Sequence, residues 1–395
     1  MLESVKQMAE SPEIDPSKLP ERLDALPGIG LLREAVGGSV PAYLVGGAVR
    51  DLLLGRPRAD LDVTVEGEIG PLADALGGEL IEHERFETAA VVVDDHEIDI
   101  ARAREETYER PGALPAVRPA TIAEDLARRD FTINAMALPL AGEPTLIDPH
   151  GGLADLESGT LRVLHDLSFQ DDPTRALRAA RYAARLGVML EPGTERLLRL
   201  ADLSTVSDDR VVGELARIAA EERPSAALKL IDHWSVLDLG GGPRLAAALE
   251  TLFDGEGEGE GESRHAWREF ANRDTAILLA VAPGEGPGRL RQRAAKLARH
   301  STPGSPAEIQ VLARDHVPEV LAIARAAGAG WLDDYASRLR HVELEITGYD
   351  LVEAGVPEGP AIGRGLNAAL AAKLDGSATD ADQELDIALD AAESG

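Results

Sequence analysis

The sequence of 395 residues contains no cysteine. This absence excludes disulfide bonds, zinc sites built on thiolates and cysteine nucleophiles. No stretch approaches the ~18 uninterrupted apolar residues that a membrane-spanning helix needs, so we expect no contact with a membrane. The first twenty residues, MLESVKQMAESPEIDPSKLP, lack the basic and then apolar pattern of a secretion signal. Together these absences favour a cytoplasmic enzyme.

Lysine is scarce as well, and basic residues are outnumbered. The chain has 40 lysines and arginines, of which five are lysines, against 70 acidic residues, for a net charge of −30. Such an excess argues against wholesale wrapping of nucleic acid, because phosphates would be repelled. Residues 161–200 depart from this balance with five acidic residues and seven arginines, which are Arg162, Arg175, Arg178, Arg181, Arg185, Arg196 and Arg199. The alternative explanation of the acidity is a compositional bias of the host genome or a cytoplasm with a high salt concentration.

Hydrophobic patterning divides the chain into a mixed α/β part and a long helical part. Residues 1–38 read as a helical extension with a break at 27–28. Apolar runs predict strands at 42–45, 61–65, 89–93, 97–101, 132–139 and 146–148. Residues 105–121, with three prolines and a glycine, read as a long loop. After Gly152 the pattern is helical almost throughout, and the segment 254–262 (DGEGEGEGE) is too polar to pack.

The first candidate site joins a double glycine to two spaced carboxylates. Gly46 and Gly47 stand between a strand and a helix, where backbone N–H groups can approach a phosphate at the positive helix end. Arg50, one turn into that helix, can contact the same phosphate. Strand alternation sends Asp60 and Asp62 to one face, where two carboxylates can hold Mg²⁺ for phosphoryl transfer. Each feature alone is common, and their combination is far more specific.

The second candidate is the block RRDFTINA at 128–135, between a predicted helix and a predicted strand. One interpretation is a helix C-terminus that carries favourable positive charge. The interpretation that fits better is nucleotide binding, with Arg129 for phosphate and Asp130 or Asn134 for ribose hydroxyls.

The third candidate is the segment DDPTRALRAARYAARLG at 171–187. Asp172 is a plausible N-cap, with proline at the first helical position. Spacings of three, three and four put four arginines on one helix face, namely Arg175, Arg178, Arg181 and Arg185. Such a stripe is commonly a solvated face. Because the opposite face is rich in alanine and leucine, the arginines are expected to point away from the core, into a cleft.

These three blocks together resemble the class II tRNA nucleotidyltransferases, which are the CCA-adding enzymes with bacterial poly(A) polymerases as sister members. The resemblance rests on YLVGGAVRDLLLGRPRADLDV, RRDFTINAMAL and DPTRALRAARYAARLG, and covers residues 41–215. LIDPHGGLADLESGTLRVL resembles a connecting motif, and 346–376 resembles part of the C-terminal tail. The family's nucleotide-reading motif begins with glutamate, where this chain has Asp171. The segment EIDIARAREETYERPGALP is similar to members that include A-adding enzymes.

The resemblance implies an α+β fold: a polymerase-β-like nucleotidyltransferase head with a mixed sheet, then a helical neck, body and tail. It implies these divisions: an N-terminal extension at 1–38, a catalytic head at 39–157, a neck for nucleotide selection at 158–225, a body at 226–300 and a tRNA-binding tail at 301–395. The implied partners are the tRNA 3′ end, ATP and CTP. No protein partner is implied.

The resemblance also implies roles for the candidate residues. Asp60 and Asp62 would bind Mg²⁺ in a two-metal mechanism. The implied nucleotide-binding residues are Gly46, Gly47 and Arg50 on the triphosphate, Arg129, Arg178 and Arg181 on the nucleotide, and Asp130 on the ribose. Glu97 and Asp99 share a strand face. One interpretation is that they supply a third carboxylate to the metal site, and the simpler one is that they are exposed acidic residues of a hairpin.

The selection of C and A without a template can be explained by matching the hydrogen-bond donors and acceptors of two side chains with those of the bases. The carboxylate of Asp172 accepts from the amino group of C or A, and the guanidinium of Arg175 donates to the ring nitrogen. U and G present a carbonyl and an N–H at these positions, so both contacts fail together. We therefore expect CCA addition to tRNA. The alternatives are a CC- or A-adding enzyme, a poly(A) polymerase, an RNA-binding protein with an inactive head, and a small-molecule nucleotidyltransferase.

Overall fold

The computed structural model describes residues 14–37, 40–56, 61–77, 79–83, 88–93, 96–255 and 261–394. The chain folds as two compact units. The first unit takes in residues 1–214 and 230–238, and the second takes in 215–229 and 239–395. Within the described residues, no helix combines the length and the apolar character needed to cross a membrane.

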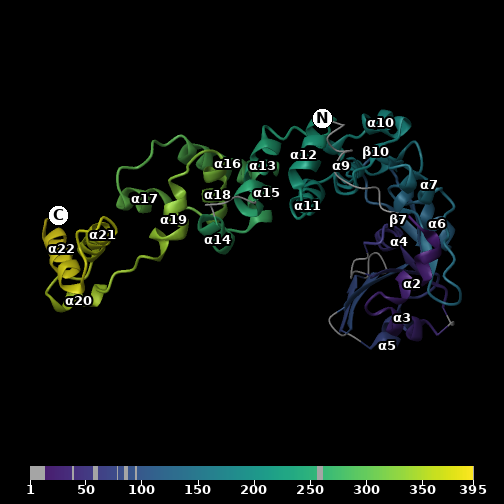
Figure 1. Cartoon of the computed structure of the whole chain (residues 1–395), viewed down its shortest axis with the longest axis horizontal. Helices are drawn as coiled ribbons and strands as arrows, with labels where there is room; N and C mark the ends of the chain where they lie inside the picture. Colours follow the sequence, from purple (N-terminus) through teal and green to yellow (C-terminus); the bar gives the residue numbers. More distant parts are fainter. Residues whose placement is uncertain are drawn as a thin grey trace. The chain divides into compact units, whose positions relative to one another are not determined.

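The first unit is built on a β-sheet (Figure 1). The sheet has six strands in the order β3-β4-β5-β2-β1-β8. Its strands are β1 (Ala42–Val45), β2 (Leu61–Val65), β3 (Glu79–His83), β4 (Thr88–Val93), β5 (His96–Arg102) and β8 (Ala137–Pro139). Strands β2 and β5 run parallel, and the other neighbours run antiparallel. The sheet is therefore mixed, and the prediction of an α+β head followed by helices is confirmed.

Alternation along β2 and β5 separates the core from the face that carries the polar residues. Leu61, Val63 and Ile98 are no more than 1% exposed, whereas Asp62 and Asp99 are exposed. The apolar side chains join a core that also takes in helices at the N-terminal end of the chain. These are α2 (Leu19–Asp24) and α3 (Ile29–Val36), which follow η1 (Pro16–Lys18). Helix α3 packs against α5 (Gly70–Leu76) beside the sheet (Figure 1).

One loop prediction and two strand predictions were wrong in part. Residues 105–121 are not one long loop, because β6 (Arg104–Thr107) and β7 (Ala116–Pro119) pair as an antiparallel hairpin. The strand expected at 132–139 is confined to β8. It is preceded by the 3-10 helix η3 (Thr132–Asn134), in which the N–H of Asn134 bonds to the carbonyl of Phe131 at 2.9 Å. The strand expected at 146–148 is reduced to one bridge between Ala137 and Ile147.

The remainder of the first unit is helical, apart from one short parallel pair of strands, β9 (Thr160–Leu161) and β10 (Met189–Leu190). Its other elements are α4 (Gly47–Leu53), α6 (Ile122–Ala127), α7 (Gly152–Glu157), α8 (Ser168–Asp171), α9 (Arg175–Leu186), α10 (Pro192–Leu198) and η4 (Leu203–Thr205). Helix α6 begins with a capping box, in which Thr121 and Glu124 bond to each other's backbone N–H groups. Helices α11 (Asp208–Ala219) and α12 (Pro224–His233) contribute to both units.

The described residues of the second unit form helices joined by turns and loops, without strands. Its helices are α13 (Gly242–Asp254), α14 (Gly261–Phe270), α15 (Arg273–Val281), α16 (Glu285–Ala298), α17 (Pro306–Ala313), α18 (Pro318–Ala326), α19 (Leu332–Ser337), η5 (Leu339–His341), α20 (Gly348–Glu353), α21 (Pro360–Leu374) and α22 (Ala381–Glu393). Trp267 is fully buried, and its indole N–H bonds to Asp333 at 2.8 Å. Of the segment 254–262, residues 256–260 lie outside the described residues, and residues 261–262 already belong to α14.

Candidate active site

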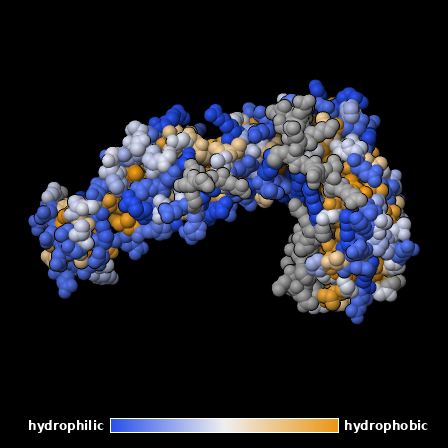
Figure 2. Space-filling view, in the orientation of Figure 1, coloured by the Kyte–Doolittle hydropathy of each residue, from blue (hydrophilic) through white to orange (hydrophobic). Residues whose placement is uncertain are grey.

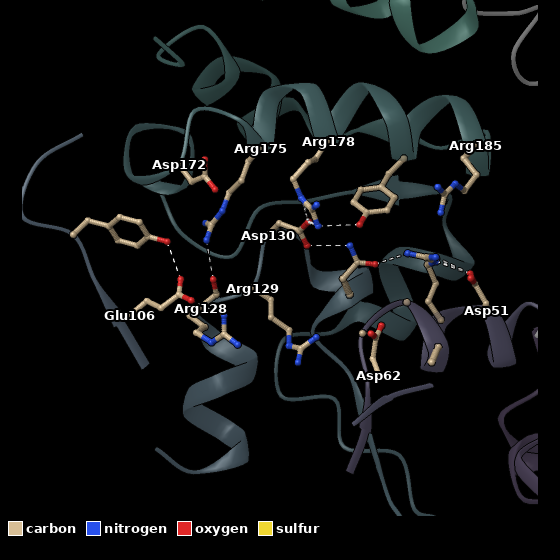
Figure 3. Close-up of a pocket in the computed structure, with 17 residues that line it drawn as sticks. Asp51, Asp62, Glu106, Arg128, Arg129, Asp130, Asp172, Arg175, Arg178 and Arg185 are labelled. Carbon is tan, nitrogen blue, oxygen red and sulfur yellow. Dashed lines mark hydrogen bonds and ion pairs between the residues drawn. The ribbon is translucent and has the colours of Figure 1, made fainter. Parts of the chain in front are cut away.

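A polar cavity of about 470 Å³ lies in the first unit, above the end of the sheet where β1 meets α4 (Figure 3). Its walls come from the β1–α4 turn, β2, β6, the end of α6, and α9. Most of the residues singled out from the sequence line it: Gly46, Gly47, Arg50, Asp62, Arg129, Asp130, Asn134, Asp172, Arg175 and Arg178. Segments far apart in the sequence thus meet at one place.

The β1–α4 turn can be made only by glycine at its first position. Gly46 has φ +67°, and a Cβ placed there would lie 2.7 Å from Nη1 of Arg129. Its N–H bonds to the carbonyl of Met136 at 3.2 Å, which ties the turn to the segment before β8. The turn therefore brings backbone N–H groups of α4 to the cavity without a side chain in between.

Two carboxylates lie side by side on the open face of the sheet. In the parallel register of β2 and β5, Asp62 pairs with Asp99, so both side chains leave the sheet on the same side. Asp62 lines the cavity. The predicted ligand Asp60 lies outside the described residues, and so does the side chain of Glu97.

The donor set suits a hard divalent cation, because carboxylate oxygens are the ligands that Mg²⁺ prefers. No three acidic, imidazole or thiol side chains among the described residues gather into a metal site by themselves. A site at this place would therefore need Asp60, which precedes Asp62 by two residues.

A buried carboxylate that the sequence reasoning missed holds the two arginines at the end of α6. Asp125 is fully buried and bonds to Arg128 at 2.7 Å and to Arg129 at 2.9 Å. Burial alone would raise its pKa, but the two guanidinium groups outweigh burial and hold the pKa below its ordinary value. Arg128 is the C-cap of α6, so its positive charge lies at a helix end, where such a charge is favourable. Together with Arg129 it also forms part of the cavity wall. The spacing of acid and arginines in EDLARRD was the available signal.

A continuous chain of side-chain hydrogen bonds crosses the cavity from α4 to α9 (Figure 3). Arg50 is 2% exposed and donates to Asp51 at 2.8 Å and to the amide oxygen of Asn134 at 2.6 Å. The amide nitrogen of Asn134 donates to Asp130 at 3.0 Å. Arg178 then donates twice to the other oxygen of Asp130, at 2.8 and 2.6 Å. The motifs that carry these residues are therefore joined into one hydrogen-bonded unit.

Asp130 and Arg178, which are partners in this chain of hydrogen bonds, shift each other's pKa strongly. Burial would raise the pKa of Asp130, but Arg178 and the Asn134 amide outweigh burial and lower the pKa to about 2. Although burial opposes it, Asp130 raises the pKa of Arg178 well above its ordinary value. Both groups are thus charged at any physiological pH.

Asp172 and Arg175 stand on the wall of the cavity formed by the start of α9. Helix α9 begins at Arg175, so the expected cap at Asp172 with proline at N1 was wrong. The N–H groups of 175 and 176 bond three residues back, which makes a tighter turn before the helix. One oxygen of Asp172, Oδ1, accepts from Thr174 and from Arg210, which lies 2.8 Å away. Within the described residues, Oδ2 accepts no hydrogen bond.

Arg175 is 5% exposed and fastened at both ends of its guanidinium. It donates to Ser168 at 2.7 Å and to the backbone carbonyl of Arg128 at 2.8 Å. These bonds use two of its five N–H donors. Arg175 therefore ties α9 to the end of α6 while it also lines the cavity.

The expectation that the arginines of α9 all point away from the core was wrong. Arg181 is 6% exposed, does not line the cavity, and pairs with Glu214 of α11 at 3.5 Å. Several guanidinium groups lie near the ring of Tyr182. The Cζ atoms of Arg181, Arg50 and Arg178 are 4.8, 5.4 and 5.5 Å from the ring centre. Helix α9 can be buried on most sides because its arginines bind hydrogen-bond acceptors, such as Glu214, from distant parts of the sequence.

Further cavity residues had no role in the sequence reasoning. Glu106 and Tyr108 come from the segment that was expected to be a loop, and the Tyr108 hydroxyl donates to Glu106 at 2.8 Å. Burial, together with the charge of Glu106, raises the pKa of Tyr108, which keeps the phenol protonated. Asp51 also lines the cavity and occurs in a quoted motif, so its position gave a signal. Arg185 lines the cavity as well, which agrees with the expectation that it points into a cleft.

Comparison with known proteins places this site in context. The model of the poly(A) polymerase head domain matches residues 42–162. A CC-adding tRNA nucleotidyltransferase of Deinococcus radiodurans is 36% identical over 364 residues, covering 89% of this chain and 90% of that protein. A CCA-adding enzyme of Lacticaseibacillus paracasei is 31% identical over 86% of this chain and 89% of its own. An A-adding tRNA nucleotidyltransferase of Geobacter sulfurreducens is 34% identical over 93% of this chain, which spans about half of that relative (47%).

Solved structures give the same picture. A Thermotoga maritima CCA-adding enzyme complexed with tRNA is 28% identical, with a TM-score of 0.67 over 95% of this chain and 97% of that one. Structures of a CCA-adding enzyme with ATP and with CTP are 28% and 29% identical, each with a TM-score of 0.71 over 95% of this chain. They cover 98% and 97% of those chains. The matches point to the same family as the motif blocks.

Proposed function

We propose that this chain, which belongs to the tRNA nucleotidyltransferase family, adds CMP and AMP to the 3′ end of tRNA to complete CCA, with release of pyrophosphate. That it is a nucleotidyltransferase of tRNA processing follows from its family. The observation that carries the finer proposal is the cavity, in which a glycine turn, an exposed carboxylate, several arginines and the pair Asp172 and Arg175 meet. One nucleotide-sized space thus holds groups for phosphate, sugar and base.

The triphosphate is assigned to the β1–α4 turn. The N–H of Gly47 opens the helix, while that of Gly46 is taken up by the carbonyl of Met136, and the turn carries no side chain that would block an anion. Nη1 of Arg129 lies against this turn, and Asp125 fixes the rest of its guanidinium. Arg50 is oriented by Asp51 and Asn134, so its contribution is a fixed positive charge in the wall.

Asp62 and, two residues before it, Asp60 are the side chains that would hold divalent metal ions, with Asp99 beside Asp62 as a further carboxylate. We take the ion to be Mg²⁺, and a bound pair would lower the pKa of the RNA 3′-hydroxyl and neutralise the departing pyrophosphate. In the transfer, the 3′-oxygen of RNA bonds to the α-phosphorus of the nucleotide and the bond to pyrophosphate breaks. The arginines of the cavity stabilise the negative charge that accumulates on the phosphate oxygens.

The sugar and the base are assigned to the α9 side of the cavity. Asp130 and Asn134 lie in the bonded chain that reaches Arg178, which suits them to position a ribose. Arg210 and Thr174 hold Oδ1 of Asp172, and Oδ2 is left to accept from the amino group of C or A. Arg175 keeps further N–H donors for the ring nitrogen. Arg181 acts indirectly in this account, because it packs behind Tyr182 rather than in the cavity.

A partial activity, CC addition or A addition, is the second candidate, because relatives with each of these names match most of this chain. Incubation with tRNAs that end before, within and after CC, each with one labelled nucleotide, separates the candidates. Full addition requires C incorporation on the first two RNAs and A incorporation on the last. Incorporation limited to C or to A identifies a partial enzyme, and long A tracts identify a poly(A) polymerase. The division into neck, body and tail, and the cytoplasmic location, stay predictions.

A further inference from the structure

Tyr182, in the middle of α9, lines the cavity and has no ligand assigned to it in the proposed function. It is 8% exposed, and its ring packs edge to face against Phe131 at 5.8 Å. Its phenol oxygen accepts a hydrogen bond from the guanidinium of Arg178 at 3.0 Å. The side chain is thus held both by its ring and by its oxygen, so it has a fixed position in the cavity wall.

The hydroxyl of Tyr182 carries a hydrogen-bond donor that none of the described residues uses. A phenol donates one hydrogen bond and also accepts, and here only the accepting side is occupied. Guanidinium groups lie near the ring, but they cannot serve as acceptors because their nitrogen atoms only donate. Their Cζ atoms are 4.8 to 5.9 Å from the ring centre and belong to Arg181, Arg50, Arg178 and Arg185. A buried donor without an acceptor is unfavourable, so we expect a bound molecule to supply one.

The neighbouring carboxylate of Asp130 indicates which kind of acceptor fits. One nitrogen of Arg178, Nη2, donates to Tyr182 at 3.0 Å and to Asp130 at 2.6 Å, so the phenol and the carboxylate are close neighbours (Figure 3). A phosphate oxygen only accepts hydrogen bonds, and the negative carboxylate would repel it. A sugar hydroxyl can accept from the phenol and donate to the carboxylate. The combination therefore favours a sugar hydroxyl over a phosphate.

Most of the visible surface of the molecule is hydrophilic, so a polar lining alone does not distinguish a binding site (Figure 2). A buried donor that is held in place without an acceptor does distinguish one. We propose that the hydroxyl of Tyr182 donates a hydrogen bond to a ribose hydroxyl of the bound nucleotide, and that it thereby discriminates against nucleotides that lack this hydroxyl. The inference rests on the proposed function, because it deepens the assignment of the sugar to the α9 side of the cavity.

The test removes the hydroxyl from the protein and from the nucleotide in turn. Tyr182→Phe keeps the ring. Tyr335→Phe is the matched control, because Tyr335 of α19 is also buried and packs edge to face against a phenylalanine, Phe270, at 5.9 Å. Binding of ATP, 2′-deoxy-ATP and 3′-deoxy-ATP is measured by calorimetry with Mg²⁺ and without RNA.

ATP should bind about fivefold more weakly to Tyr182→Phe than to wild type, which is the effect of one neutral hydrogen bond. The analogue that lacks the contacted hydroxyl should bind equally to both proteins, because its bond to the phenol is already missing. Tyr335→Phe should match wild type for all three nucleotides. No loss in Tyr182→Phe, or an equal loss for ATP and both analogues, would overturn the proposal, since the phenol would then contact a phosphate or only position Arg178.

A second measurement separates a direct contact from an effect through Asp130. Unfolding by denaturant at several acidic pH values reports on the pair of Asp130 with Arg178, because this pair lowers the pKa of the carboxyl. Tyr182→Phe should keep the acid dependence of wild type. Loss of that dependence would trace the change in binding to a displaced Arg178 and overturn the contact with the sugar.

Failure of the proposed function would look different. Wild type that binds the three nucleotides as expected but adds none to tRNA contradicts the proposed function and leaves the role of Tyr182 intact. Normal addition to tRNA, with equal losses for the three nucleotides in Tyr182→Phe, contradicts only the role of Tyr182.

Discussion

The guanidinium of Arg178 donates two hydrogen bonds to one oxygen of Asp130, at 2.8 and 2.6 Å, and so joins α9 to the segment before β8. The two residues are 48 positions apart in the chain. Asp130 is 8% exposed, so its carboxylate is largely shielded from solvent and from salt, whereas Arg178 is partly exposed in the cavity. Breaking the pair removes the main counter-charge of Arg178 and leaves Glu214, 3.3 Å away, as its other acidic partner, so the charge stays partly compensated.

Asp130→Asn is therefore expected to lower the free energy of unfolding by about 1–3 kcal/mol and to weaken nucleotide binding. Asp155→Asn serves as the control, because Asp155 is also buried and paired with an arginine, Arg162, away from the cavity. Both variants should melt earlier, but only the first should raise the KM for nucleotides. Equal KM values in the two variants would mean that Asp130 only stabilises the fold.

The same pair predicts a pH dependence of stability. The pKa of Asp130 falls from 3.8 to about 2 on folding, so its contribution is fully present above pH ~4 and is lost as the pH falls towards 2. Unfolding by denaturant between pH 2 and 6 should show wild type losing stability over this window relative to Asp130→Asn. Parallel curves for the two proteins would contradict the assignment.

Gly46→Ala should damage activity through the position of Arg129. The new Cβ would lie 2.7 Å from Nη1 of Arg129 at a backbone φ of +67°, so the guanidinium has to move. We expect kcat/KM to fall about 10²-fold, as for a misplaced group near the reaction. Gly77→Ala is the control for an alanine at a positive φ, since Gly77 has φ +65° and ψ 17°, against ψ −129° at Gly46, with no atom within 4 Å of the added Cβ. A similar loss in both variants would trace the effect to backbone strain alone.

Asp62→Ala should abolish metal-dependent nucleotide incorporation and leave the fold intact, because the side chain is exposed on the sheet face. Asp60→Ala is expected to do the same. Melting temperature and incorporation at several Mg²⁺ concentrations are the measurements. Rates close to wild type from either variant would show that the two carboxylates do not form the metal site.

The sequence predicted the elements whose pattern is local. Strands β1 and β2 follow from short apolar runs, and α4 follows from the double glycine before it. The β6–β7 hairpin was missed because its prolines and glycine resemble those of an irregular loop. The burial of Arg175 and Arg181 was missed for a different reason. Their acceptors, the carbonyl of Arg128 and the carboxylate of Glu214, come from other elements, so helical spacing alone could not reveal them.

The role of Asp172 and Arg175 in reading the base is best tested by single-turnover incorporation of all four nucleotides. Wild type should be compared with Asp172→Ala, Arg175→Ala and the control Asp171→Ala, whose carboxylate does not line the cavity. We expect the first two variants still to transfer nucleotides, with UTP and GTP gaining on CTP and ATP, and Asp171→Ala to keep wild-type ratios. Unchanged ratios in Asp172→Ala and Arg175→Ala, with a lowered melting temperature, would contradict it and make the pair a purely structural tie between α9 and α6.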